Sequence, residues 1–157
     1  MPVLVRELRD KKQTGREMYR VTRRYAHDLD RIRVARGRTL TPLSRLTLHE
    51  LHTVVKKLPY ERDVSPVEVV ARPLASIKLA GSYGIDCKKK AAIMGAWCEL
   101  HGFPWRYVCG STRADGRIHH VWPQIQTGRQ WRNIDATYPE YRMFGVKQVT
   151  NFEVLNP

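Results

Sequence analysis

Residues 84–104 read GIDCKKKAAIMGAWCELHGFP, and this stretch decides the fold. Asp86 is a favourable helix N-cap, Gly102 is typical of the position just after a helix C-terminus, and Pro104 prevents continuation. The pattern predicts a helix that begins at Cys87. One face of this helix is expected to form a stripe that packs on the rest of the domain: Cys87, Ala91, Met94, Cys98 and His101.

Upstream of this stretch the sequence indicates helices. A basic amphipathic helix over about 16–36 is predicted by apolar residues at helical spacing: Met18, Val21, Tyr25, Leu29 and Ile32. A second helix is predicted from Thr41, as its N-cap, to the residues before Pro59. Residues 65–80 begin with Ser-Pro, a helix-start signal, but Pro73 interrupts any long helix, so we assign them no conformation.

Downstream the pattern changes to strands. We expect strands over 105–109, 118–126 and 130–137, separated by turns at Asp115-Gly116 and Thr127-Gly128. Helices followed by an antiparallel sheet define an α+β domain.

The last two predicted strands form a hairpin that selects one histidine. With a two-residue turn at Thr127-Gly128, the residue numbers of opposite residues add up to 255. This places His120 across from Asp135, with Cβ atoms about 5 Å apart. On the same face, Trp122 would lie opposite Asn133 and Gln124 opposite Trp131. His119 would point to the other face.

Composition sets the broad class. A chain of 157 residues fits one domain with a real core. The sequence has no apolar run near the roughly 20 residues of a membrane span, and its start lacks a secretory signal. We therefore expect a cytoplasmic protein that does not enter a membrane.

The positive charge is uneven. The net charge is +13, so acidic partners are expected. Residues 1–38 hold 12 Lys/Arg against 5 Asp/Glu, and we predict that they form a basic helical N-terminal arm, with residues 39–157 as the main domain. The arm is either a solvated helix docked by one face or a contact surface for an acidic protein or nucleic acid.

The cysteines point to thiol chemistry rather than to a scaffold. Three cysteines at 87, 98 and 109 cannot all pair, and no Cys-x-x-Cys step occurs, so free thiols are expected and neither a metal site nor a cofactor is predicted. Cys98 is expected in helix packing and Cys109 in the strand core.

Cys87 has the features of a nucleophile. A thiol at a helix N-terminus feels the positive end of the macrodipole, which favours the thiolate. His120 would serve as its base, oriented by Asp135. The alternative for Lys88, Lys89 and Lys90, which follow the thiol, is an ordinary solvated positive face.

These residues resemble a known family. The Gly-x-x-Cys helix start, the alanine-rich helix ending at Gly-Phe-Pro, the Arg-Tyr-Val strand, and then His-x-Trp and Trp-x-x-x-Asp-x-Thr resemble the transglutaminase-like superfamily of papain-like cysteine enzymes over about 84–138. The resemblance implies a papain-like core in which a Cys-bearing helix packs on an antiparallel sheet. It also implies a triad of Cys87 as nucleophile, His120 as general base and acid, and Asp135 as orienting carboxylate.

The remaining site residues follow from the same resemblance. The candidates for the oxyanion hole are the Cys87 backbone N–H and Tyr83, and those for the substrate groove are Trp122 and Trp131. The three lysines stand where family members commonly carry acidic residues.

The resemblance implies a cysteine enzyme that cleaves protein or peptide amides through a thioester, as a protease or amidase ahead of a cross-linking enzyme. In size and layout the chain looks most like members encoded by phages and prophages. The alternative is a weakly active or inactive assembly protein, such as a virion component anchored by its basic arm.

Overall fold

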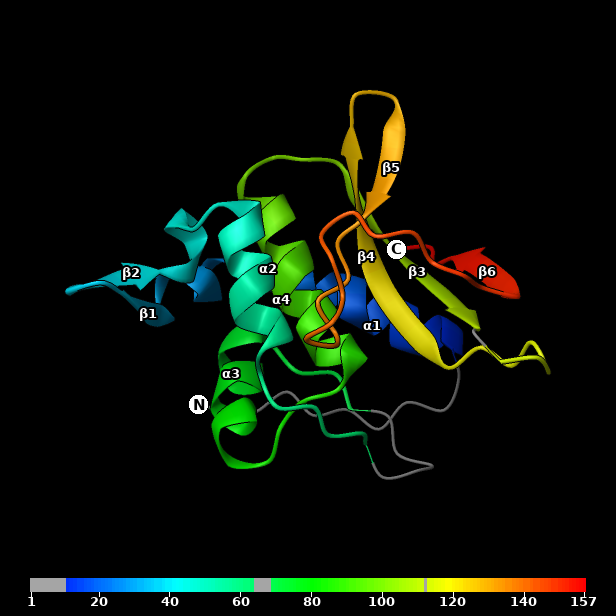
Figure 1. Ribbon diagram of the computed structural model, residues 1–157, viewed down its shortest axis with the longest axis horizontal. Helices are drawn as coiled ribbons and strands as arrows, with labels where there is room; N and C mark the ends of the chain where they lie inside the picture. Colours follow the sequence, from blue (N-terminus) through cyan, green and yellow to red (C-terminus); the bar gives the residue numbers. More distant parts are fainter. Residues whose placement is uncertain (1–10, 64–68, 112) are drawn as a thin grey trace.

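The fold is a cluster of helices packed on one antiparallel sheet, seen here in a computed structural model that describes residues 11–63, 69–111 and 113–157 (Figure 1). The helices are α1 (Lys11–Arg24), α2 (Leu48–Lys56), α3 (Pro73–Ser82) and α4 (Cys87–Leu100). The sheet has the order β5-β4-β3-β6, all antiparallel. Its strands are β3 (Trp105–Ser111), β4 (His120–Thr127), β5 (Gln130–Asn133) and β6 (Asn151–Val154). The α+β prediction is confirmed, whereas β6 was not predicted.

Helix α4 is the centre of the fold. It contacts α1, α2 and α3 and also strands β3 and β4. Every residue from Cys87 to Cys98 is buried except Lys88, so the predicted single stripe was too narrow. At Gly95 an added Cβ would stand 3.0 Å from the Tyr107 hydroxyl and 3.2 Å from Thr22 Cγ2, which is why α1 can cross so closely there.

Both predicted ends of α4 are confirmed. The Asp86 side chain accepts the Lys89 N–H at 3.1 Å, as an N-cap does. Gly102 has φ +70°, and Phe103 N–H donates to Cys98 O at 3.1 Å in a Schellman closure. The position of Cys87 in the first turn follows directly from these local signals.

The single helix predicted over 16–36 is wrong beyond Arg24. There the chain turns into a 3-10 helix, η1 (Ala26–Asp30), and then into strand β1 (Arg33–Arg36), which pairs with β2 (Thr39–Pro42). The buried Asp28 carboxylate anchors this turn, because it accepts hydrogen bonds from Arg72 Nε at 2.7 Å and from Leu74 N–H at 3.1 Å.

The apolar residues of this region were nevertheless chosen correctly. Met18, Val21, Leu29 and Ile32 are buried in the same hydrophobic cluster as α4. The described residues on either side of the boundary predicted at residue 38 therefore share one core.

Helix α2 begins later than predicted. Thr41 and Pro42 lie in β2, whose register pairs Pro42 with Arg33. The true N-cap is Thr47, and Thr47 and Glu50 form a reciprocal capping box that outweighs the Thr-Pro signal. Pro73 stands at the first position of α3, where its missing N–H costs nothing, while the Ser65-Pro66 signal lies outside the described residues.

All three cysteines are free thiols, as predicted, and all three are buried. Burial raises the pKa of Cys98 to about 12 and that of Cys109 to about 11, so both fit the predicted packing roles. Among the described helices none has the length and apolarity needed to cross a bilayer.

Candidate active site

The segment before Cys87 is held in place by backbone pairing. Ile85 N–H donates to Pro59 O at 2.9 Å, and Glu61 N–H donates to Ile85 O at 3.3 Å. Gly84 has φ +83°, and a Cβ there would lie 3.0 Å from Pro59 O, so the close approach requires glycine. This pairing brings the residues around Tyr60 alongside the first turn of α4.

The three lysines after Cys87 do not form a solvated face, so that alternative is wrong. The Lys88 and Lys89 ammonium groups both pair with Asp63 and Asp86, with Lys89 Nζ 2.7 Å from Asp63 Oδ1. Burial alone would raise the pKa of Asp63, but the hydrogen bond from Lys89 and the adjacent lysine charges lower it. The two cations are thus neutralised beside the thiol.

Lys90 has a different environment. It is 1 % exposed, and its Nζ donates to Leu58 O at 2.6 Å and to Thr137 O at 2.8 Å. Burial lowers its pKa to about 8. Lys90 therefore connects the Cys87 helix to the segment that follows Asp135 and to the segment before Tyr60.

The predicted meeting of His120 with Asp135 occurs, although the predicted register is wrong. In β4–β5 the paired residues sum to 257, as in Thr127↔Gln130, and the loop is Gly128-Arg129. A change of two keeps every side chain on its predicted face. His120 is then a diagonal neighbour of Asp135, and its Nε2 lies 2.6 Å from Asp135 Oδ2.

Cys87 lies close to this pair and contributes to the raised pKa of His120. Because Nε2 of the ring is bonded to Asp135, Nδ1 is the ring nitrogen left for a second contact. Burial alone would lower the pKa of His120, but the hydrogen bonds and charges of Asp135 and Cys87 raise it to about 9. Burial likewise opposes ionisation of Asp135, yet His120 and Lys147 lower its pKa to about 2. The arrangement stabilises an imidazolium between two acidic groups.

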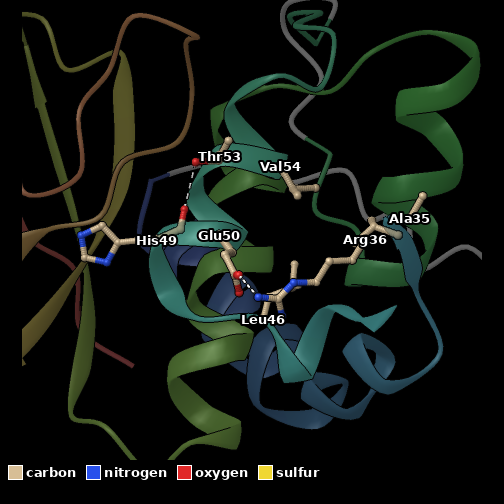
Figure 2. A pocket seen from close by; sticks show the side chains of 8 residues that line it. Ala35, Arg36, Leu46, His49, Glu50, Thr53 and Val54 are labelled. Atoms are coloured by element: carbon tan, nitrogen blue, oxygen red, sulfur yellow. Dashed lines mark hydrogen bonds and ion pairs between the residues drawn. The ribbon is translucent and has the colours of Figure 1, made fainter. Parts of the chain in front are cut away.

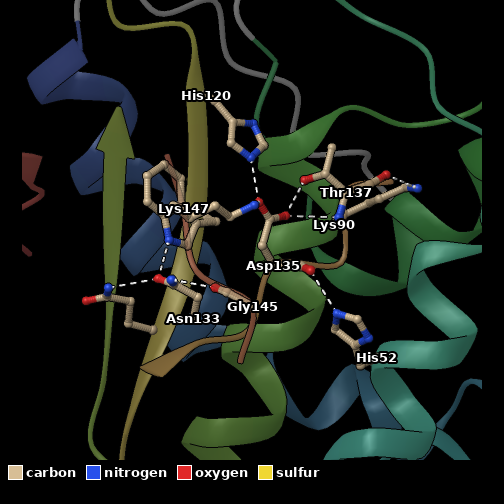
Figure 3. Close-up of polar contacts among 10 residues, drawn as sticks. His52, Lys90, His120, Asn133, Asp135, Thr137, Gly145 and Lys147 are labelled. Carbon is tan, nitrogen blue, oxygen red and sulfur yellow. Dashed lines mark hydrogen bonds and ion pairs between the residues drawn. The ribbon is translucent and has the colours of Figure 1, made fainter. Parts of the chain in front are cut away.

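The Asp135 carboxylate is fixed from several sides (Figure 3). Oδ1 accepts the Thr137 N–H at 3.0 Å and its hydroxyl at 2.6 Å, while Oδ2 also receives Lys147 Nζ at 2.5 Å. From α2, His52 Nε2 bonds the Asp135 backbone carbonyl at 2.7 Å, and burial lowers the pKa of His52 so that it donates as a neutral ring. The carboxylate has little freedom to turn away from His120.

Aromatic rings surround the imidazole and the thiol. Trp122 stacks on His120 with centroids 5.4 Å apart, and Tyr141 stands edge-on at 6.4 Å. Tyr138 lies between Tyr141 and Tyr60, 5.2 Å and 5.0 Å from their rings. Burial, followed by the charge of Cys87, raises the pKa of Tyr60.

The other predicted site residues are placed as follows. Tyr83 caps α3 and is 77 % exposed, so its phenol is directed to solvent and does not share the buried environment of Cys87. Trp122 and Trp131 both line one surface pocket of about 290 Å³, together with Asn133, Lys147 and Phe152. Trp122 itself is 1 % exposed, and its indole N–H donates to Asn133 Oδ1 at 2.8 Å. Cys87 is 8 % exposed.

Several residues near the site were missed from the sequence. Lys90 follows Cys87 by three positions and could have been placed on the same helix face. Tyr60, Tyr141 and Lys147 lie in segments without regular structure, where no periodicity predicts a neighbour. The described residues contain no group of three or more His, Cys, Asp and Glu side chains that could hold a metal ion.

Comparison with known proteins gives the family. The sequence profile of the transglutaminase-like superfamily matches residues 37–136, most of the chain, and the chain belongs to this superfamily. Broadly, this is a superfamily of cysteine enzymes.

One solved structure that resembles the chain is that of a "Putative Cysteine Protease" from Cytophaga hutchinsonii, with a TM-score of 0.44 and 15 % sequence identity. The match covers 80 % of this chain but only 38 % of the other. No curated protein matches the chain.

Proposed function

We propose that the protein is a cysteine hydrolase of peptide or glutamine amides. Cys87 is the nucleophile, His120 the general acid and base, and Asp135 the group that orients the imidazole. The single observation that supports this most strongly is the 2.6 Å contact of His120 Nε2 with Asp135 Oδ2, together with the contribution of Cys87 to the raised pKa of His120. Family membership supports the same chemistry.

The proposed reaction has two steps. The Cys87 thiolate attacks the amide carbonyl carbon, and the resulting oxyanion is stabilised by the Cys87 backbone N–H, which belongs to the first turn of α4 and has no intrahelical acceptor. His120 gives its Nδ1 proton to the leaving amine as the C–N bond breaks, which leaves a thioester. His120 then takes a proton from water, hydroxide adds to the thioester carbonyl, and the acid and the thiolate are released.

The test compares Cys87→Ala with wild-type protein in three assays. They are cleavage of an unfolded protein, ammonia release from a blocked glutamine peptide, and incorporation of a labelled amine. Cys109→Ala is the matched control, because Cys109 is also a buried free thiol. Loss of turnover in Cys87→Ala alone supports the proposal, and the three assays separate protease, amidase and cross-linking activity. Equal turnover in Cys87→Ala and wild type would exclude the mechanism.

A second candidate function is binding of an acidic partner by the basic N-terminal sequence, within an assembly such as a virion. Residues 31–45 contain five arginines and neither Asp nor Glu. Four of these arginines lie on or beside the β1–β2 hairpin and are exposed: Arg31, Arg33, Arg36 and Arg38. Arginine forks suit phosphate and carboxylate oxygens, and this role is compatible with catalysis elsewhere.

Binding to a short DNA duplex at several salt concentrations tests this candidate. If phosphate is the partner, the affinity for DNA falls steeply as the salt concentration rises. The double variant Arg33→Gln/Arg38→Gln is then expected to make the slope of log affinity against log salt concentration shallower by about 2. Absence of salt-dependent binding to DNA excludes nucleic acid and leaves an acidic protein surface as the partner to test.

A further inference from the structure

Lys147 occupies a position that the triad alone does not explain. It lies on the chain between β5 and β6, where residues 134–150 form neither helix nor strand. Its Nζ is 2.5 Å from Asp135 Oδ2, the same oxygen that lies 2.6 Å from His120 Nε2 (Figure 3). An ammonium and an imidazole therefore share one carboxylate oxygen.

Other contacts hold the ammonium at this place. Lys147 Nζ stands 3.6 Å from the centre of the Tyr141 ring and 5.6 Å from that of Trp122, which are favourable cation–π distances. Asn133 fixes the backbone nearby, since its side chain donates to Gly145 O at 2.9 Å and its carbonyl accepts from Phe144 N–H at 3.0 Å. The Lys147 side chain is only 14 % exposed.

The charges of the site show what this cation does. If Cys87 and His120 form a thiolate–imidazolium pair, Asp135 is a second buried anion beside the imidazolium. With Asp135 as its sole partner on that side, the imidazolium would hold its proton very firmly and give it up poorly. Lys147 neutralises part of the carboxylate charge and also repels the imidazolium, and both effects make the proton easier to release.

We propose that Lys147 is a positioning residue that shares the Asp135 carboxylate with His120 and so sets the pH range over which His120 releases its proton. The effect of Lys147 on catalysis rests on the proposed function. Its effect on the protonation of His120 does not. The charged and titratable groups around the pair come from four parts of the fold: Cys87 and Lys90 on α4, His52 on α2, Tyr60 before α3, and Asp135, Tyr141 and Lys147 after β5.

The titration of His120, followed by NMR of the histidine ring nitrogens, tests the assignment directly. Its signal is identified by its absence in His120→Gln. Lys147→Met keeps the aliphatic stem but removes the charge, and we expect the His120 midpoint to rise by about one pH unit. Lys147→Arg keeps the charge and is expected to restore the wild-type midpoint. Lys147→Gln replaces the Met variant if the latter does not fold.

An unchanged midpoint in Lys147→Met would overturn the assignment, as would an equal rise in Lys147→Arg. The alkaline limb of kcat/KM is a separate readout, and we expect it to move with the midpoint of His120. If wild-type protein has no turnover but the midpoint moves as expected, the proposed function fails and the coupling of Lys147 to His120 stands.

Discussion

Two groups of cationic side chains in this molecule have opposite surroundings. Lys89, Lys90 and Lys147 lie within the site, where each ammonium has specific acceptors. The arginines of the β1–β2 hairpin stand in solvent, and Arg36 has one ion pair, with Glu50, beside a surface pocket between the hairpin and α2 (Figure 2). The net charge of +13 thus combines internal structural cations with a true basic surface, which composition cannot separate.

Lys90→Met is expected to have the largest effect on stability. It leaves the buried carbonyl oxygen of Thr137 and the partly buried one of Leu58 without their donor, and losing both hydrogen bonds costs about 2–5 kcal/mol in total. Urea unfolding measures this loss. Lys78→Met, also in a helix but exposed, is the matched control and should change the free energy of unfolding by less than about 0.5 kcal/mol. Equal effects would remove the distinction between internal and surface cations.

The pH dependence of stability tests the charges at the site. His120 has a raised folded pKa of about 9 against 6.5 unfolded, so its contribution is complete below 6.5 and is lost as the pH rises through 9, by about 3 kcal/mol. Asp135 has a lowered folded pKa of about 2 against 3.8, so its contribution is complete above 3.8 and is lost as the pH falls through 2. Both contributions are complete between about pH 4 and 6.5.

Urea unfolding of wild type and His120→Gln over a pH series gives this contribution as a difference curve. The stability difference should be largest from about pH 4 to 6.5 and should shrink towards pH 9. His27→Gln is the surface comparison, since that side chain is 85 % exposed. A flat difference curve for His120→Gln would show that the folded protein does not stabilise the protonated His120 ring.

The smallest effect is expected at the hairpin. The Arg36–Glu50 pair is 58 % and 34 % exposed, and such surface pairs contribute about 0.2–1 kcal/mol. Arg36→Gln should therefore lower the free energy of unfolding by less than about 1 kcal/mol. This decrease should be smaller at high salt, where the pair is screened. Arg38→Gln serves as the comparison within the same hairpin. A loss near that of Lys90→Met would mean that the hairpin belongs to the core of the fold.

The fold was predictable wherever a local signal acts alone. Asp86 and Gly102 determine the ends of α4 by their own hydrogen bonding and φ, and both were identified. The apolar spacing through Leu29 and Ile32 identified buried residues correctly but not their conformation, because the turn after Arg24 depends on Asp28 meeting Arg72 from 44 residues away. Hydrophobic periodicity predicts which residues are buried, but it does not predict contacts between residues that are distant in sequence.

The site was predictable to the extent that it depends on strand alternation. His120 and Asp135 fall on the same face in either register, so an error of two in the pairing did no harm. Lys147 and Tyr60 could not be found in this way, since they reach the site from irregular segments whose positions are set by Asn133 and by the pairing of Ile85 with Pro59 and Glu61. Their roles became visible only in three dimensions.

The rate of Cys87 alkylation by iodoacetamide across pH 5–9, in wild type and His120→Gln, tests most directly whether thiol, imidazole and carboxylate act as one unit. We expect wild-type protein to react at pH 6 at least about tenfold faster than His120→Gln, because the proposed mechanism has a protonated His120 activate the sulfur, and the pKa of His120 is raised to about 9. Equal rates in the two proteins, rising together only above about pH 8, would contradict this account.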